Sequence, residues 1–320
     1  MTKLKLQPKF IWPEAKFSSL SFFKKTHSDT VEAELKTLYP NVFPVLFSSA
    51  RAGLVNLLIF LKANKLTNVW TPLYSSHCVL ESISRIGFPC SDILNAQISV
   101  VYHQWGYKQE YSSQNQIIIE DSADSFFLPG DIIFPNDGNF QLVSLPKSLG
   151  CYGGGILLCK SEEDAQMIRK IRNTKINNTY LHFLLKLLGR HNKQLYFYWD
   201  SFESALGYPP NLLCTDVLNK MEKIDLFVKQ IKDNIRTFKA EGIYSEENTL
   251  PDRLPCAIPF QNFQNLTNTV GNSIKEYRMF NTSYCYNNTH FEKVLPIPIH
   301  KDINKLFIEQ FLRNVHNPIS

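Results

Sequence analysis

Between residues 42 and 159, short apolar runs alternate with segments whose apolar positions recur at helical spacing. Val42–Phe47 predicts a strand, and residues 51–64 carry apolar side chains at 54, 55, 57, 58 and 61, which predicts a helix with Ser49 as its N-cap. A second helix is predicted at Cys78–Ile86, ended by Gly87. Further strands or short apolar runs are predicted at 68–71, 98–103, 116–119, 131–134, 141–145 and 153–159. This alternation predicts an α/β fold with a mostly parallel sheet between helices.

After Ser161 the pattern changes to longer amphipathic segments. Helices are predicted at Glu162–Asn173, Asn177–Arg190 and Thr215–Glu241, the last with a broad apolar stripe. The C-terminal residues contain a strand at Val294–Ile299 and a final helix at Asp302–Val315. We therefore expect three parts: an N-terminal arm (1–27), a large α/β domain (28–240) and a small C-terminal α+β domain (241–320).

Composition excludes several classes of protein. The 320 residues are 44% hydrophobic and 20% charged, as in ordinary globular proteins. No apolar run reaches the roughly 18–20 residues of a membrane helix, and no apolar segment of a secretory signal follows the first lysines, so we expect a cytoplasmic protein without a membrane partner. The net charge of +5 is scattered, which argues against a nucleic-acid partner. The cysteines, seven with irregular spacing and no CxxC, predict reduced thiols and no zinc site, and no other cluster has metal-ligand spacing.

Three features along the chain indicate a binding or catalytic site. First, small residues and Arg51 follow the first strand (Ser48-Ser49-Ala50-Arg51), where the amino end of a helix favours a phosphate; an ordinary helix cap is the alternative. Second, Asp121 ends a buried strand and points toward the crevice where α/β proteins bind ligands, unless it merely caps a helix after the strand.

The third feature is a lysine beside a glycine turn. Lys147 follows an apolar strand and precedes Gly153-Gly154-Gly155. A partly desolvated lysine at such a place can form a Schiff base, although a solvated loop lysine would look the same. Together, an anion site, a carboxylate, a lysine and glycines follow one another in the order of fold-type-I enzymes that use pyridoxal 5'-phosphate (PLP).

Short motifs add a family resemblance from about Val45 to Glu241. The sequence resembles a divergent member of the DegT/DnrJ/EryC1/StrS family of PLP-dependent sugar aminotransferases. The matching segments are Ser49-Ala50-Arg51-Ala52-Gly53-Leu54, Val69-Trp70-Thr71-Pro72-Leu73-Tyr74, Gly87-Phe88-Pro89, Val100–Gly106, Ile118-Ile119-Glu120-Asp121-Ser122-Ala123, Ser144–Lys147 with Gly153–Gly155, Gly207-Tyr208 with Asn211 and Met221–Asp225, and Val294–Ile297.

The resemblance implies roles for single residues. Lys147 would bond the cofactor covalently and act as general acid and base, and Asp121 would pair with its pyridine nitrogen. Further cofactor contacts would come from Ala50 and Arg51 (phosphate, through backbone N–H groups), Ser144 (phosphate, through its hydroxyl), His77 (stacking on the ring), Asp124 (ring hydroxyl) and Asn211 (phosphate of the other subunit). Asp124 stands where the family usually has Gln or His.

The resemblance also implies a fold and an activity. The fold would be that of fold-type-I PLP transferases, and the active site would lie at the interface of a homodimer. The enzyme would move an amino group from an amino acid, such as glutamate, to a keto sugar nucleotide in the synthesis of amino sugars for surface polysaccharides. Two alternatives stay open: a PLP enzyme with a different carbonyl or amino-acid substrate, and a catalytically dead homologue that serves as a binding or scaffold subunit.

Overall fold

The computed structural model describes most of the chain. The described residues are 11–16, 25–113, 116–128, 131–175, 206–244, 253–261 and 277–316, with 180, 181, 184, 185, 188, 192, 194, 195 and 249. The helical elements are α1 (Ser28–Leu38), α2 (Ala50–Phe60), α3 (His77–Ile86), the 3-10 turn η2 (Gln104–Gly106), α4 (Leu145–Ser148), α5 (Glu162–Asn173), α8 (Asn211–Met221), α9 (Ile224–Ala240) and α11 (Lys305–His316). The strands are β1 (Phe43–Phe47), β2 (Asn68–Trp70), β3 (Phe88–Cys90), β4 (Ile98–Tyr102), β5 (Ile117–Asp121), β6 (Phe126–Phe127), β7 (Phe140–Ser144), β8 (Gly155–Cys159), β9 (Arg253–Leu254), β10 (Ala257–Phe260), β11 (Arg278–Asn281) and β12 (Phe291–Pro298).

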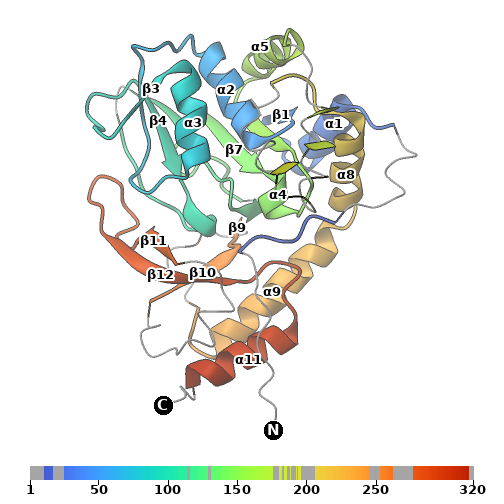
Figure 1. Cartoon of the computed structure of the whole chain (residues 1–320), viewed down its shortest axis with the longest axis vertical. Helices are drawn as coiled ribbons and strands as arrows, with labels where there is room; N and C mark the ends of the chain where they lie inside the picture. The colour runs from blue at the N-terminus through green and yellow to red at the C-terminus, as the bar shows by residue number, and fades with distance from the viewer. Residues whose placement is uncertain are drawn as a thin grey trace.

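A seven-stranded sheet organises the first half of the chain (Figure 1). Its strand order is β1-β8-β7-β5-β4-β2-β3, and β8 alone runs antiparallel to its neighbours. All the other strands of this sheet therefore end at the same edge. In open α/β sheets that edge is where ligands bind. The predicted α/β class with a mostly parallel sheet is confirmed.

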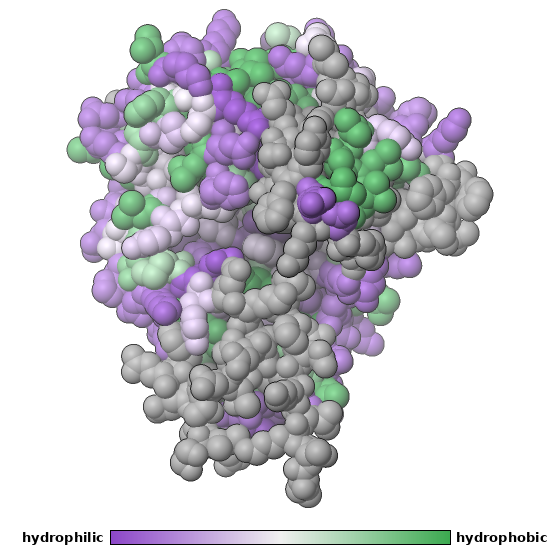
Figure 2. Space-filling model, in the orientation of Figure 1, coloured by the Kyte–Doolittle hydropathy of each residue, from purple (hydrophilic) through white to green (hydrophobic). Residues whose placement is uncertain are grey.

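Helices cover both faces of the sheet, which is why its central strands are apolar almost throughout. Alternate residues of β1 show the two faces: Val45 and Phe47 pack under α2 and α5, whereas Leu46 packs on the opposite side with α1 and α8. In the view of Figure 2, polar residues are numerous on the surface over α2 and α3.

The C-terminal part packs below the large sheet in Figure 1. It contains an antiparallel sheet in the order β10-β12-β11, and the helix α11 lies beside α9. Backbone contacts tie this part to the segments that follow β4 and β5. Cys256 N–H donates to the carbonyl of Trp105 (3.1 Å), Tyr286 N–H donates to the carbonyl of Glu110 (2.9 Å), and the short strand β9 pairs with β6. No helix in the described part of the chain is long and apolar enough to cross a membrane.

Two sequence-based expectations need correction. The single helix predicted at Thr215–Glu241 is two helices, α8 and α9, interrupted at Glu222 and Lys223. The break redirects the apolar stripe: α8 contacts α1, whereas α9 contacts α11, and one straight helix would not serve both. The apolar run at 131–134 lies outside the sheet, because the buried Arg253 side chain binds Asp131 (3.0 Å) and the carbonyl of Ile132 (2.9 Å). The helix predicted at Asn177–Arg190 falls largely outside the described residues.

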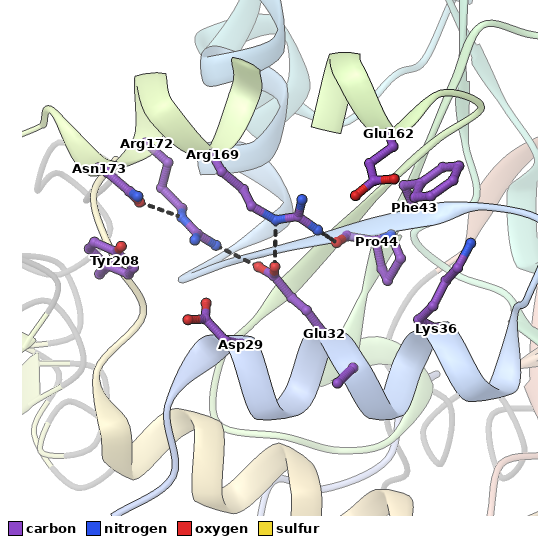
Figure 3. Close-up of a pocket in the computed structure, with 11 residues that line it drawn as sticks. Asp29, Glu32, Lys36, Phe43, Pro44, Glu162, Arg169, Arg172, Asn173 and Tyr208 are labelled. Carbon is purple, nitrogen blue, oxygen red and sulfur yellow. Dashed lines mark hydrogen bonds and ion pairs between the residues drawn. The ribbon is translucent and has the colours of Figure 1, made fainter. Parts of the chain in front are cut away.

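A buried ion cluster joins α1, β1 and α5 (Figure 3). The Glu32 carboxylate accepts from Arg172 (2.7 Å), from Arg169 (2.7 Å) and from the backbone N–H of Leu46 (2.8 Å). Arg172 is only 1% exposed and also donates to the carbonyl of Leu46. A cavity of about 580 Å³ opens beside this cluster, and its lining includes Lys36 and other residues of α1, β1 and α5.

A second buried charge lies at the end of β5. Glu120 is fully buried and accepts from the His103 ring (2.6 Å) and from the backbone N–H groups of Asn136 and Gly138 (both 2.9 Å). Since the N–H of Gln109 donates to Nδ1 of His103 (3.1 Å), the neutral ring carries its proton on Nε2 and donates it to Glu120. A Cβ at position 138 would lie 2.4 Å from Cγ of Glu120, so this contact requires glycine. Burial lowers the pKa of His103, although Glu120 opposes the shift. Burial by itself would raise the pKa of Glu120, but its hydrogen bonds and His103 lower it.

The ion cluster leads to a stability prediction for Glu32→Gln. The substitution keeps the shape of the side chain but leaves the buried Arg172 without its counter-charge, which typically costs about 3–5 kcal/mol. We expect the free energy of unfolding in urea to fall by about that amount. The matched control, Glu34→Gln at an exposed position of the same helix, should change it by less than about 0.5 kcal/mol. A loss of similar size in both variants would contradict the role of Glu32.

The buried histidine leads to a prediction on pH. The pKa of His103 is lower in the folded than in the unfolded chain, so unfolding takes up a proton once the pH falls below the unfolded value of about 6.5. Stability should therefore decline on acidification, with His103 contributing up to about 1.4 kcal/mol per pH unit. His103→Asn, which has no proton to take up, should show a shallower decline between pH 7 and 5. Urea unfolding of both proteins at several pH values measures the difference, and parallel curves would refute the prediction.

Candidate active site

Asp121 ends β5 at the carboxyl edge of the sheet. Because neighbouring strand residues point to opposite faces, Asp121 lies on the other side of the sheet from Glu120. Its side chain is buried and accepts a hydrogen bond from the N–H of Ala123 (3.0 Å). Burial raises its pKa, with the charge of Lys147 opposing the shift. Asp121 is therefore a buried carboxylate that a further positively charged donor would stabilise.

Lys147 lies on α4, a single turn that follows β7 directly. Its Nζ is 2.7 Å from Oδ1 of the fully buried Asp124, whose other oxygen accepts a hydrogen bond from the Tyr102 hydroxyl. The Lys147 side chain keeps 28% of its surface exposed, so a ligand can reach it. Burial by itself would lower the pKa of Lys147, but Asp124, with smaller contributions from Cys78 and Asp121, raises it above its ordinary value. The structure thus brings Lys147, Asp124 and Asp121 together.

The start of α2 is joined to the lysine turn. The N–H of Leu145 donates to the carbonyl of Gly154 (3.1 Å), and the N–H of Gly154 donates to the carbonyl of Ser48 (2.8 Å). The predicted N-cap is confirmed, because Oγ of Ser49 accepts from the N–H of Ala52 (3.1 Å). This arrangement sets the amino end of α2, where an anion is favoured, at the same edge as the two carboxylates and the lysine.

Ala50 and Arg51 form the first turn of α2. A Cβ on Gly155 would lie 2.2 Å from the backbone nitrogen of Ala50, so the glycine turn lets β8 approach the amino end of this helix. The Arg51 guanidinium extends toward α3, where it lies 3.8 Å from Glu81. Its side chain therefore braces two helices, while its backbone belongs to the anion-favouring turn.

Three other predicted site residues lie at the edges of this region. His77 is exposed at the start of α3, one residue before Cys78. Asn211 is exposed at the start of α8. Ser144 ends β7, and its carbonyl accepts from the hydroxyl of Ser148 (3.0 Å). These positions leave the proposed contacts of His77, Asn211 and Ser144 with a cofactor as predictions.

Several neighbours of Lys147 and Asp121 had no assigned role in the sequence reasoning. The Trp12 ring centroid lies 4.7 Å from Nζ of Lys147. The hydroxyl of Tyr286, from the C-terminal part, donates to the carbonyl of Tyr102 (2.7 Å), and burial together with the charge of Asp121 raises its pKa. Tyr102 lies inside a recognised motif, but Trp12 and Tyr286 are more than 100 residues from Lys147 and their surroundings have no periodicity that indicates a site.

The residues present fit PLP. The pyridinium N–H is a positively charged donor that would stabilise the buried Asp121. The accessible amine of Lys147 can bond the aldehyde, and the amino end of α2 at the same edge favours the phosphate. The large cavity of Figure 3 is a different place, because none of its lining residues is Lys147, Asp121 or Asp124. Glu32 pairs there with both Arg169 and Arg172, which marks a structural cluster.

Comparisons with known proteins identify the family and the fold. A family model described as "Putative PLP-dependent aminotransferase" matches residues 31–319. No curated protein matches the sequence.

Solved structures show the fold. The PLP form of "Putative sugar aminotransferase Spr1654" from Streptococcus pneumoniae superposes with a TM-score of 0.66 at 10% identity, over 95% of this chain and 96% of that chain. The aminotransferase TlmJ from Streptoalloteichus hindustanus gives 0.63 at 12% identity, over 98% of both chains. A DegT DnrJ EryC1 StrS aminotransferase from Brucella abortus gives 0.59 at 14% identity, over 90% of this chain and 89% of that chain.

The fold predicted from the motifs is confirmed by these neighbours, and the cofactor and enzyme class are confirmed by the family match. With Lys147 and Asp121 at the carboxyl edge of a fold-type-I sheet, and a family model covering nearly the whole chain, the protein belongs to the family of PLP-dependent aminotransferases.

Proposed function

We propose that this enzyme transfers an amino group from an amino acid, with glutamate the expected donor, to a keto sugar nucleotide, in the synthesis of amino sugars for surface polysaccharides. The observation that carries the proposal is the meeting of Lys147 and Asp121, a lysine and a buried carboxylate, at one edge of the sheet. The sugar substrate is supported by the neighbouring structures, which include sugar aminotransferases and a protein solved with its TDP-sugar product.

Each residue at the edge of the sheet has a task in this proposal. PLP, when bound, supplies a ring that accepts electrons from the carbon at which a proton is removed. Asp121 holds the proton on the ring nitrogen, and its own burial makes that contact favourable. Lys147 provides the amine that bonds the cofactor, and once released it carries the proton to and from the reacting carbon. Ala50 and Arg51 present backbone N–H groups to the phosphate.

Asp124 controls the protonation of Lys147 through their ion pair. Its charge keeps Lys147 protonated in the protein without cofactor, and the hydroxyl of Tyr102 fixes the carboxylate in place. Only a neutral amine attacks an aldehyde, so the ion pair must open, or its proton must leave, before the cofactor bonds. Asp124 then lies beside the place where the family resemblance puts the ring hydroxyl.

The remaining roles are proposals about assembly. Because Asn211 is exposed on α8, it is able to reach a neighbouring molecule, and we propose that it contacts the phosphate of the second subunit in a homodimer. Ser144 and His77 are proposed to complete the phosphate and ring contacts, after small movements of their side chains.

Covalent attachment tests the proposal directly. The purified protein is incubated with PLP, its visible spectrum is recorded, and borohydride is added to make the lysine–cofactor bond permanent. We expect peptide mass spectrometry to find stoichiometric phosphopyridoxyl on Lys147. Lys147→Arg, which keeps the positive charge beside Asp124, should lose the visible band of the bound cofactor and retain only substoichiometric label on exposed lysines. Lys160→Arg, at an exposed lysine, serves as the control. An unlabelled wild-type Lys147 would overturn the proposed function.

Asp121→Asn tests the second half of the pair. The amide cannot hold the ring nitrogen as a cation, so the reaction loses electrostatic stabilisation worth about 10²–10³-fold in rate. We expect Lys147 still to be labelled by PLP and borohydride, while the conversion of PLP to its amine form by glutamate slows by that factor. Equal rates in the two proteins would show that Asp121 does not contact the ring.

Asp124→Asn tests the ion pair through pH. Removing the carboxylate charge lowers the pKa of Lys147, so more of the amine is neutral at a given pH. The rate of PLP attachment, followed by quenching with borohydride at timed intervals, should reach its half-maximum at a lower pH than in the wild type. Tyr102→Phe, which leaves the charge and removes only the hydroxyl, should shift the profile less. An unchanged profile in Asp124→Asn would refute this role.

A further inference from the structure

The N-terminal segment 11–16 is anchored across the active site. Gly150, which lies just after the lysine turn, has φ +70°, and an added Cβ would lie 3.0 Å from the Glu14 carbonyl oxygen and 3.3 Å from Cβ of Pro13. On the other side, the N–H of Glu14 donates to Asp302 of the C-terminal part (2.9 Å). Ile11 and Pro13 are buried. The segment therefore has fixed contacts with both parts of the chain, and Trp12 lies between these anchors.

Trp12 has two features that bear on the site. Its ring centroid lies 4.7 Å from Nζ of Lys147, the atom at which the chemistry occurs. Its indole Nε1 is buried, and no hydrogen-bond acceptor for it lies within reach among the described residues. Buried donors are nearly always paired, so an N–H without an acceptor next to a reactive lysine indicates that a ligand supplies the acceptor.

We propose that Trp12 is a specificity-determining residue that recognises the sugar part of the substrate: its ring face packs against the C–H face of the sugar, and Nε1–H donates to a sugar or phosphate oxygen. This inference rests on the proposed function. A substrate carbon that reacts at Lys147 must come close to Nζ, and the indole already occupies one side of that position. The face that now lies over the ammonium is then available to the substrate, because bonding of the cofactor takes Lys147 out of its ion pair.

The sugar is favoured over the amino acid for a chemical reason. A sugar ring presents both a flat C–H face and many oxygen acceptors, which matches a broad aromatic face with one N–H donor at its edge. An α-amino acid presents a compact carboxylate, whose usual partner is the charged fork of an arginine rather than an indole. Trp12 should therefore affect binding of the sugar nucleotide and leave bonding of the cofactor unchanged.

The experiment measures the two ligands separately. Wild type, Trp12→Phe, Trp12→Ala and the control Lys16→Ala, an exposed position of the same segment, are loaded with PLP, and attachment to Lys147 is checked by borohydride labelling. Binding of UDP-glucose and of dTDP-glucose, two unreactive sugar nucleotides, is then measured by calorimetry. Trp12→Phe keeps a ring but loses the N–H, and we expect affinity for the better probe to fall by about tenfold. Trp12→Ala should lose at least as much again, and Lys16→Ala should match the wild type.

Failure of this inference differs from failure of the proposed function. Unchanged affinity in both Trp12 variants, or loss of Lys147 labelling in Trp12→Phe, overturns the role of Trp12. Failure of wild-type Lys147 to become labelled overturns the proposed function itself. Labelling of Lys147 without binding of either sugar nucleotide overturns the sugar-nucleotide substrate, and the inference about Trp12 with it.

Discussion

The structure depends on how two neighbouring carboxylates at the end of one buried strand are stabilised. Burial of an ionised carboxylate is costly unless opposite charge or hydrogen-bond donors surround it. Glu120 and Asp121 face opposite sides of β5, so each needs its own partners. The partners of Glu120 come from within the chain and include a neutral His103. Asp121 accepts from one backbone N–H and lies near the charge of Lys147. Burial nevertheless raises its pKa, and a positively charged nitrogen of a bound cofactor would stabilise the carboxylate.

Charge pairing also sets the state of Lys147 before the cofactor binds. Asp124 holds the ammonium of Lys147 in the protein without cofactor, and Tyr102 holds Asp124. This ion pair keeps opposite charges together in the site until a cofactor replaces it. Residues from distant parts of the chain close around the pair, with Trp12 from the N-terminal segment and Tyr286 from the C-terminal part. The site is therefore complete only when the N-terminal segment and the C-terminal part pack on the carboxyl edge of the sheet.

The cavity of Figure 3 lies beside a different cluster of charges. Beside it, Glu32 pairs with both Arg169 and Arg172 where α1 and α5 pack across β1. The two guanidinium groups share the Glu32 carboxylate, so the cluster holds α1 and α5 to the edge strand β1. This cavity is not lined by Lys147, Asp121 or Asp124, whereas a buried carboxylate and an accessible amine meet at the edge of the sheet near Lys147.

Much of the architecture can be predicted from local patterns. Alternating apolar runs and amphipathic segments predicted β1, α2, β2, α3, β4, β5, β7, β8 and α5, because burial on both faces of a sheet demands continuous apolar strands and helical stripes. The order of Asp121, Lys147 and the glycines predicted the class of chemistry. At one edge of the sheet, β5 ends with Asp121, β7 ends just before Lys147, and the antiparallel β8 begins with Gly155. Where local pattern and packing disagree, packing prevails: the apolar stripe at 215–241 reads as one helix, yet two parts of the protein require it to break.

By itself, the sequence determined the α/β class, the position of the helix cap at Ser49, and the places of Asp121 at the end of one buried strand and Lys147 after another. Tertiary structure alone decided that Asp124 would pair with Lys147, that Tyr102 would hold it, and that Trp12 and Tyr286 would enclose the site. The reason is physical: hydrophobic periodicity is a local property that a sequence displays residue by residue, whereas the pairing of charges depends on distances between segments that only the folded chain brings together.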